Sequence, residues 1–362
     1  MRSVCFLLAA AAAAGLLVAQ TPEVPVRWLP ISTPEFEVDG LPWFAQNKGD
    51  LVRLPLTLEK VVRPPVWNLA KSPSGARIRF RTDAPSVSIR LEYPSAPNMT
   101  NMHAFGQTGV DLYADGVYIA TAIADKDAVP GKVIEKVFFS GMPKVDREIT
   151  IYLSLYKPVK VIAIGLPEAR LNRPKPYALA HPVVFYGTSI TQGGCASRSG
   201  MSYQAILGRM LNLDFVNQGY SGNGMGEPEM AKAMAEIDAA AYVLDFAQNN
   251  RTVDSLSKVY APFLETLRAR HPDTPILAIT PIYSAREATG DKELQKMRDH
   301  IRQVVSRAIA SGDRHLQLVE GTDLLGPAQG DGLVDGTHPN DLGFQSMAAG
   351  LATRFRQFLS LP

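Results

Sequence analysis

Five residues in the second half of the chain are of types that could carry out one reaction together. They are Ser189, Gly222, Asn249, Asp335 and His338. The first three lie just after apolar runs typical of buried strands, and the last two lie just before an amphipathic stretch that predicts a helix. The set offers a nucleophile, oxyanion donors and an acid–base pair, which are the groups that acyl transfer requires.

The hydroxyl of Ser189 needs a base to accept its proton, and a lone serine at such a position more often caps a helix. Asp335 and His338 are three residues apart. If Gly336 and Thr337 form a turn, the carboxylate can contact one ring nitrogen while the other faces the serine. Taken singly, Asp335 could equally cap the following helix and His338 could lie on the surface. The combination favours a Ser-His-Asp triad.

Gly222 and Asn249 are candidate oxyanion donors. A glycine lets its backbone N–H approach a ligand without a side chain in the way. An asparagine amide is a neutral donor, and loss of one such donor usually costs about 2.7–4 kcal/mol of barrier. Each residue alone could instead belong to an irregular loop or a helix cap.

The elements that must position these groups alternate between strand and helix. Apolar runs at 183–186, 213–216, 242–246, 276–280 and 316–319 predict buried parallel strands. Helical patterns lie near 202–212, 228–238, 256–270, 292–311 and 340–359. This alternation predicts a flavodoxin-like doubly wound α/β sheet over residues 177–362. In such sheets the active site lies at the carboxyl ends of the strands.

Residues 21–172 have a different pattern, with alternating apolar and polar residues at 77–81 and 87–91. Asp115-Gly116 is a hairpin signal. No clear helical periodicity interrupts this region, so we expect an antiparallel β-sandwich of jelly-roll type. The segment 171–176 reads as the linker to the second domain.

The first twenty residues predict a secretory signal peptide. Arg2 precedes an apolar run from Cys5 to Ala19, and cleavage is expected near Ala19 or Gln20. The alternative, a membrane anchor, is disfavoured because a span needs about 20 apolar residues. We therefore expect an exported protein with no membrane span in the mature chain. That chain would hold a single cysteine, Cys195, and so no intramolecular disulfide.

Composition excludes several other classes of function. The formal net charge of +2 gives no reason to expect a nucleic-acid partner. No metal-ligand pair of the His-x-x-x-His or Cys-x-x-Cys kind and no phosphate-binding loop is present in the sequence. We therefore expect neither a metal nor another cofactor. Oligomeric state stays open.

The segments around these five residues resemble the conserved blocks of the SGNH (GDSL-like) hydrolase superfamily. The resemblance implies that Ser189 is the nucleophile and also an oxyanion donor through its backbone N–H. It implies that Gly222 and Asn249 complete the oxyanion hole, and that Asp335 and His338 form the acid–base pair.

Two departures from the family pattern stand out. Thr188 replaces the usual Asp before the serine, and Ala247-Gln248-Asn249-Asn250 replaces the usual Gly-x-Asn-Asp. These departures point away from the typical lipase branch. The first domain, through 77–82 and 109–113, resembles the N-terminal domain of a two-domain branch. That resemblance implies a carbohydrate esterase.

The sequence thus predicts a secreted serine esterase that hydrolyses acyl esters, with O-acetyl groups on a polysaccharide as the favoured substrate. The alternatives are a lipase or thioesterase, or a catalytically idle glycan-binding protein on the same scaffold. Trp28, Trp43 and Trp67 all lie in the first domain, where core or interdomain packing is favoured over stacking on sugars. The polar loop 98–103 could reach over the second domain's site.

Overall fold

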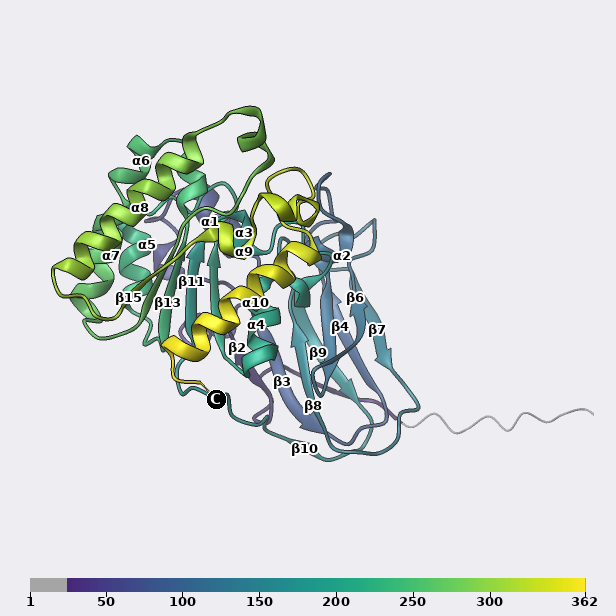
Figure 1. Ribbon diagram of the computed structural model, residues 1–362. Helices are drawn as coiled ribbons and strands as arrows, with labels where there is room; N and C mark the ends of the chain where they lie inside the picture. The colour runs from purple at the N-terminus through teal and green to yellow at the C-terminus, as the bar shows by residue number, and fades with distance from the viewer. Residues whose placement is uncertain (1–24, 362) are drawn as a thin grey trace, which may run out of the picture.

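The computed structural model describes residues 25–361, so the expected signal peptide lies outside the described residues. An antiparallel β-sandwich is followed by a parallel sheet with helices on both faces (Figure 1). The expected fold class is therefore confirmed. Within the described range, no helix combines the length and the apolar character that crossing a bilayer would require.

The sandwich consists of two antiparallel sheets. One has four strands in the order β1-β9-β4-β7, and the other has six, in the order β10-β3-β8-β5-β6 with β2 also paired to β3. Inward-facing side chains such as Ile78, Phe80 and Ile89 are fully buried between the sheets, as the alternating pattern requires. The strands are β1 (Arg27–Leu29), β2 (Glu37–Asp39), β3 (Arg77–Thr82), β4 (Val87–Glu92), β5 (Val110–Ala114), β6 (Val117–Ala122), β7 (Val133–Phe139), β8 (Arg147–Tyr152), β9 (Lys160–Leu166) and β10 (Leu171–Asn172).

The parallel sheet has five strands in the order β12-β11-β13-β14-β15. This is the flavodoxin-like order, in which β12 is added on one side of the first strand, β11, and the later strands are added on its other side. The strands are β11 (Val183–Gly187), β12 (Phe215–Gly219), β13 (Ala241–Asp245), β14 (Ile276–Ile279) and β15 (Leu316–Val319). Their ends lie within three residues of the ends of the apolar runs, because strands buried on both faces are almost continuously hydrophobic.

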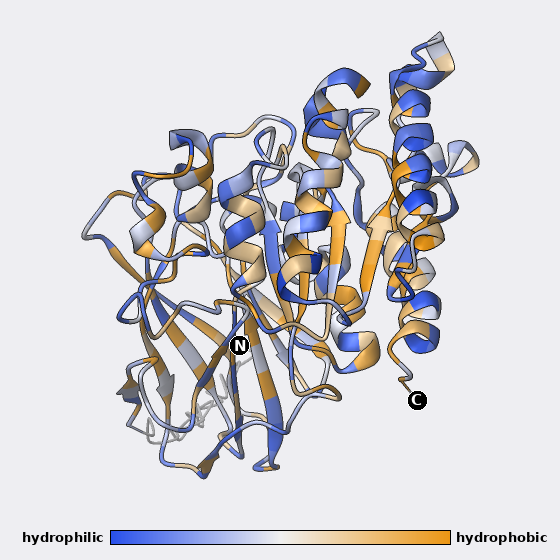
Figure 2. Ribbon diagram, turned by 90° about the vertical axis from the view of Figure 1, so that its left-hand side faces the viewer, coloured by the Kyte–Doolittle hydropathy of each residue, from blue (hydrophilic) through white to orange (hydrophobic). Residues whose placement is uncertain are grey.

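Successive residues of each parallel strand enter two different cores. Val184 and Tyr186 face α5, α7 and α8, whereas Val183 and Phe185 face α4 and α10. Figure 2 shows the hydrophobic strands flanked by these helices. The helices of this half are α3 (Ser189–Gln192), α4 (Tyr203–Leu211), α5 (Pro228–Ala235), α6 (Val253–Ser257), α7 (Tyr260–Arg270), α8 (Glu293–Ala310), α9 (Gly321–Leu324) and α10 (Asp341–Phe358), with 3-10 turns η2 (Ser199–Met201), η3 (Ala247–Asn250), η4 (Ala285–Thr289) and η5 (Pro327–Gly332).

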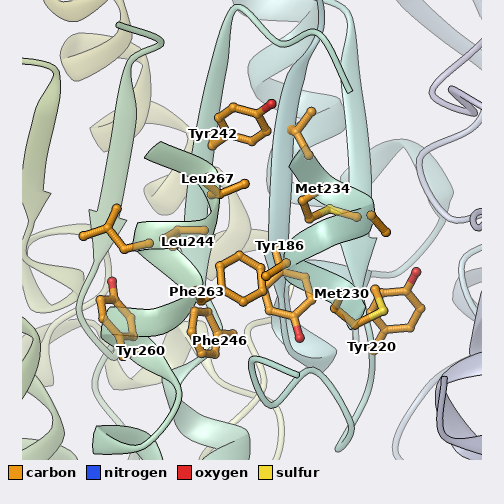
Figure 3. Close-up of a cluster of buried hydrophobic side chains, with 14 of the residues drawn as sticks. Tyr186, Tyr220, Met230, Met234, Tyr242, Leu244, Phe246, Tyr260, Phe263 and Leu267 are labelled. Atoms are coloured by element: carbon orange, nitrogen blue, oxygen red, sulfur yellow. The ribbon is translucent and has the colours of Figure 1, made fainter. Parts of the chain in front are cut away.

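The first core is rich in aromatic rings. Tyr186 stacks on Phe263 with ring centroids 4.6 Å apart, and Phe246 packs against both (Figure 3). Such pairs add to the free energy of area burial. They hold β11 and β13, the strands that lead into the candidate site, in a fixed position.

The expectation that no helix interrupts the N-terminal half is wrong. The 3-10 turn η1 (Leu56–Leu58) and the short helices α1 (Pro64–Ala70) and α2 (Ala104–Thr108) lie there. The helix α1 begins with two prolines, which suit the first helical turn because its N–H groups need no partner. Helices this short show no periodicity that could have revealed them.

The segment 41–70 leaves the sandwich and packs against the face of the parallel sheet that α5, α7 and α8 cover. Trp43 and Trp67 are buried in the same core as Met230 and Tyr220. The prediction that these two tryptophans serve packing is therefore confirmed. Trp28 instead lies on β1 with the Arg90 guanidinium 3.8 Å from its ring centroid.

The predicted linker is also shorter than expected. Leu171 and Asn172 form β10, which pairs with β3 and so belongs to the sandwich.

Candidate active site

Three of the five predicted residues lie at the carboxyl ends of three adjacent strands. Ser189 begins α3 just after β11, Gly222 lies in the turn after β12, and Asn249 lies in η3 after β13. Because β11 pairs with both β12 and β13, the three segments meet at one edge of the sheet. This is the place where ligands bind in open α/β sheets.

Asp335 and His338 lie in a tight loop between η5 and α10. An antiparallel bridge between Leu333 and Pro339 closes this loop. Gly336 adopts a φ of 78°, a left-handed conformation that glycine accepts without strain. The loop therefore has the turn that the spacing of Asp335 and His338 requires.

The structure brings the hydroxyl, the imidazole and the carboxylate together in one line. Ser189 Oγ lies 2.8 Å from His338 Nε2. His338 Nδ1 lies 2.8 Å from Asp335 Oδ2 and 3.1 Å from Oδ1. Ser189 is 8% exposed, so the nucleophile candidate lies in a largely buried position.

Asp335 is held by donors from both halves of the molecule. Its carboxylate accepts the backbone N–H of His338 at 2.9 Å and the Asn101 side-chain amide at 3.1 Å. Partial burial alone would raise its pKa, but these hydrogen bonds and the His338 ring hold the pKa of Asp335 well below its ordinary value. The loop 98–103 does reach the candidate site, in agreement with the expectation from its position and polarity.

Cys195 lies beside this pair. One ligand atom from each of Cys195, Asp335 and His338 falls within 4.8 Å of the others, which is a spacing that metal sites share. Burial and the nearby Asp335 raise the pKa of the Cys195 thiol to about 12, and its Sγ donates to the Asn101 carbonyl at 3.1 Å. A protonated thiol is a poor nucleophile, and its hydrogen bond joins Cys195 to the loop that holds Asn101 beside Asp335.

The candidate oxyanion donors differ in what they contact. Within residues 25–361, the backbone N–H groups of Ser189 and Gly222 have no hydrogen-bond acceptor. Gly222 has a φ of 66° and open space where a Cβ would lie. Asn249 Nδ2 instead donates to the carbonyls of Tyr220 at 3.1 Å and Gly224 at 3.2 Å. These two hydrogen bonds therefore hold the ends of the Gly222 turn.

Sequence reasoning missed Gln192, which lies buried at the end of α3. Its Oε1 accepts the backbone N–H of Ser221 at 2.9 Å, and its Nε2 donates to the Leu155 carbonyl at 3.0 Å. One amide thus links the nucleophile helix, the Gly222 turn and the sandwich. A glutamine shortly after a serine gives no such signal in a single sequence.

The contact made by Thr188 shows why threonine can replace the usual aspartate before the serine. Its hydroxyl accepts the backbone N–H of Ile190 at 3.2 Å and so caps α3. Threonine and aspartate are both good N-caps, and therefore the replacement preserves the local turn.

Asp245 is a buried carboxylate at the end of β13. It accepts hydrogen bonds from Thr191 and Tyr203, each at 3.2 Å. Burial raises the pKa of Asp245 to about 7, because these bonds do not offset the loss of water. The carboxyl group lies behind α3 and supports it.

Arg53, from the segment that leaves the sandwich, is fully buried below the Gly222 turn. Its guanidinium donates to the carbonyls of Asn217 and Gly219 on β12, and to those of Leu69 and Ser72. Its Cζ also lies 4.5 Å from the centroid of the Tyr220 ring. Arg53 thus ties the N-terminal half to the strand that ends at the turn.

Comparison with known families agrees with this architecture. Residues 180–356 match the GDSL-like Lipase/Acylhydrolase family. Residues 26–171 match the N-terminus of Esterase_SGNH_hydro-type. The search of curated proteins gave no match.

Several solved structures are similar over nearly the whole chain. A Bacteroides ovatus protein classed as a GDSL-like lipase has 30% identity and a TM-score of 0.83, covering 93% of this chain and 99% of that one. A salicylyl-acyltransferase from a tetracycline biosynthetic pathway has 20% identity and a TM-score of 0.75, with coverage of 92% and 97%. A family two carbohydrate esterase from Clostridium thermocellum, solved with cellohexaose, has 15% identity and a TM-score of 0.63, with coverage of 93% and 99%.

The last two likenesses concern the fold alone, whereas the first relative and the family models extend over both halves. The chain therefore belongs to the GDSL-like lipase/acylhydrolase family of SGNH hydrolases, in the branch that carries an N-terminal β-sandwich.

Proposed function

We propose that this protein is an exported serine esterase that removes O-acetyl groups from carbohydrates by a Ser-His-Asp triad. The observation that carries the proposal is the alignment of Ser189, His338 and Asp335 through two contacts of 2.8 Å. Geometry of this kind is what a general base needs in order to activate a hydroxyl.

In the acylation step, His338 Nε2 takes the proton of Ser189 while Oγ bonds to the ester carbonyl carbon. Asp335 accepts the Nδ1–H and stabilises the imidazolium that forms. Its lowered pKa keeps it ionised throughout the neutral range. The tetrahedral intermediate then expels the alcohol, which leaves with the proton from His338.

The carbonyl oxygen gains negative charge in that intermediate. The free N–H groups of Ser189 and Gly222 are suited to stabilise it, and Asn249 is assigned as the third donor. In the unliganded site Asn249 bonds to the carbonyls on either side of Gly222. To act as a donor, its amide must share or exchange one of these bonds when the oxyanion forms.

Deacylation repeats the sequence with water. His338 removes a proton from water, the hydroxide attacks the acyl carbon, and the bond to Ser189 Oγ breaks. Oγ recovers its proton from His338 and acetate leaves. No cofactor is needed at either step.

The substrate class is supported by two features. The sandwich half matches the N-terminus of Esterase_SGNH_hydro-type, and similar folds include a carbohydrate esterase solved with cellohexaose. Export is supported by the signal-like residues 1–20. We assign 21–172 to a sandwich domain and 177–362 to a hydrolase domain, although segment 41–70 packs on the latter.

The direct test compares Ser189→Ala with a matched control, Ser311→Ala, at an exposed position after α8. We expect the first variant to lose at least 10³-fold in hydrolysis of 4-nitrophenyl acetate, and the second to match the wild type. Circular dichroism checks that both are folded. Full turnover in folded Ser189→Ala would remove the nucleophile assignment.

A second measurement separates the substrate classes. Acetate released from acetylated polysaccharides supports a carbohydrate esterase. Faster turnover of octanoyl than of acetyl esters would favour a lipase, and glycan affinity without any hydrolysis would favour an idle binding protein.

A further inference from the structure

A cleft of about 480 Å³ opens beside the turn that carries Gly222. Ser221 and Asn223, the residues on either side of that glycine, form one wall. The sandwich forms the facing wall, and α1 contributes exposed residues to a third side. The facing wall and α1 supply Asn98, Met99, Tyr156, Lys157, Pro65, Asn68 and Leu69.

The cleft adjoins the nucleophile through the sandwich wall. The Tyr156 hydroxyl donates to the backbone carbonyl of Ser189 at 3.3 Å, and Lys157 is the next residue. A group bound in the cleft would therefore lie next to an ester carbonyl held between Ser189 and Gly222.

Lys157 is the one charged residue among those that line the cleft. Its Nζ donates to Asn98 Oδ1 at 2.8 Å, and no ion pair joins it to a carboxylate within the described residues. The nearby Arg63, by contrast, is neutralised by Glu227. Partial burial lowers the pKa of Lys157, since nothing of opposite charge compensates the lost water.

The remaining lining suits a polar ligand. The side chains of Asn68, Asn98 and Asn223 and the Tyr156 hydroxyl can donate and accept hydrogen bonds. The cleft is many times larger than an acetyl group and falls within the range of sites that hold a sugar-sized molecule. The alcohol half of the ester is therefore the part that fits it.

We propose that this cleft binds the alcohol half of the substrate, and that Lys157 selects alcohols that carry a carboxylate, such as an acetylated uronic acid. This inference rests on the proposed esterase function and specifies its substrate. The carboxylate would supply the counter-charge that Lys157 lacks, and the amides would bind neighbouring hydroxyl groups.

The test uses two esters of the same shape, 4-acetoxybenzoate and the neutral 4-acetoxybenzamide. We expect Lys157→Met to lower kcat/KM for the benzoate about tenfold, mainly through KM, and to leave the benzamide within about twofold. Lys157→Arg should retain most of the preference. Lys126→Met, at an exposed lysine in the loop after β6, should change neither ester.

A second variant and a second pair of esters separate a charge effect from a purely structural one. Asn98→Ala removes the lysine's partner but keeps its charge, so the benzoate preference should survive. Equal losses on both esters in Lys157→Met and Asn98→Ala would mean that Lys157 only pins its loop, which overturns the inference. Mono-4-nitrophenyl succinate, compared with 4-nitrophenyl pentanoate, places the charge on the acyl side, and a Lys157-dependent preference there would overturn the placement.

Hydrolysis of the two esters also separates this inference from the proposed esterase function on which it rests. A wild-type enzyme that hydrolyses both esters without any dependence on Lys157 refutes the carboxylate selection alone. An enzyme that hydrolyses neither removes the proposed function and this inference together.

Discussion

The two halves of the molecule approach the candidate active site in different ways. The parallel sheet presents Ser189 and Asn249 on turns that directly follow buried strands. The sandwich sends long irregular segments instead, which bring Asn101, Lys157 and Arg53 to the same place. The ends of the parallel strands thus fix the assigned nucleophile and one assigned oxyanion donor, whereas the sandwich loops supply groups assigned to positioning and recognition.

This difference predicts that substitutions in the two halves will affect different measurable properties of the protein. Substitutions in the turns after the parallel strands should lower kcat. Substitutions in the sandwich segments should alter stability, KM or the fine positioning of the triad. The predictions below are ordered from the largest expected effect to the smallest.

After Ser189→Ala, the largest effect is expected for Asn249→Ala. Loss of one oxyanion donor typically lowers kcat about 10²–10³-fold, and here it would also release the ends of the Gly222 turn. Steady-state kinetics with 4-nitrophenyl acetate measure it. Asn172→Ala, at an exposed asparagine of β10, is the control. A kcat within twofold of wild type would exclude Asn249 from the oxyanion hole.

The next effect is on stability. Arg53→Met would leave four backbone carbonyls without their donor in a buried site, so we expect a loss of about 3 kcal/mol in the free energy of unfolding. Urea denaturation gives the value. Arg173→Met, at a side chain that is 71% exposed, should change it by less than about 0.5 kcal/mol. Equal stability of both variants would mean that Arg53 does not join the halves.

A smaller effect is expected where the sandwich contacts Asp335. Asn101→Ala removes one hydrogen bond to the carboxylate, and we expect kcat to fall about 3- to 10-fold with KM unchanged. Asn101→Asp should be more harmful, because it places a like charge beside Asp335. If both variants are as active as the wild type, the contact between Asn101 and Asp335 has no role in positioning the triad.

The last prediction concerns pH. The folded pKa of Asp245, about 7, is above its value in an unfolded chain, so the native state binds the proton more tightly. Proton binding by Asp245 therefore stabilises the native state of the wild type. The wild type should lose this stabilisation as pH rises from about 4 to about 7. Asp245→Asn lacks that slope, and its Tm relative to wild type should be higher at pH 8 than at pH 5. A difference in Tm that does not change with pH would contradict the raised pKa.

The sequence predicted the parallel strands closely and the sandwich less completely. Runs such as 183–186 are hydrophobic at every position, a signal that depends on no partner. Strand β7 and the helices α1 and α2 were not predicted, because short elements are stabilised by tertiary packing more than by local pattern. The positions that were predicted best are those where local composition alone decides the structure.

The candidate site shows the same division. Ser189, Asp335 and His338 were predicted as one candidate triad from their order and spacing, and they lie in contact in the structure. Arg53 and Gln192 were not, since a buried arginine looks like a surface residue in sequence and its carbonyl acceptors carry no residue signature. The contact of Asn101 with Asp335 joins positions 234 residues apart, and only the folded chain reveals it.

The central claim is that His338 activates Ser189 as the nucleophile. A fluorophosphonate that reacts with activated serines tests it directly, with intact mass and peptide mapping as the readout. We predict a single adduct on Ser189 in the wild type, and none in Ser189→Ala or in folded His338→Ala. An adduct on another residue, or undiminished labelling of Ser189 without the imidazole, would contradict this account.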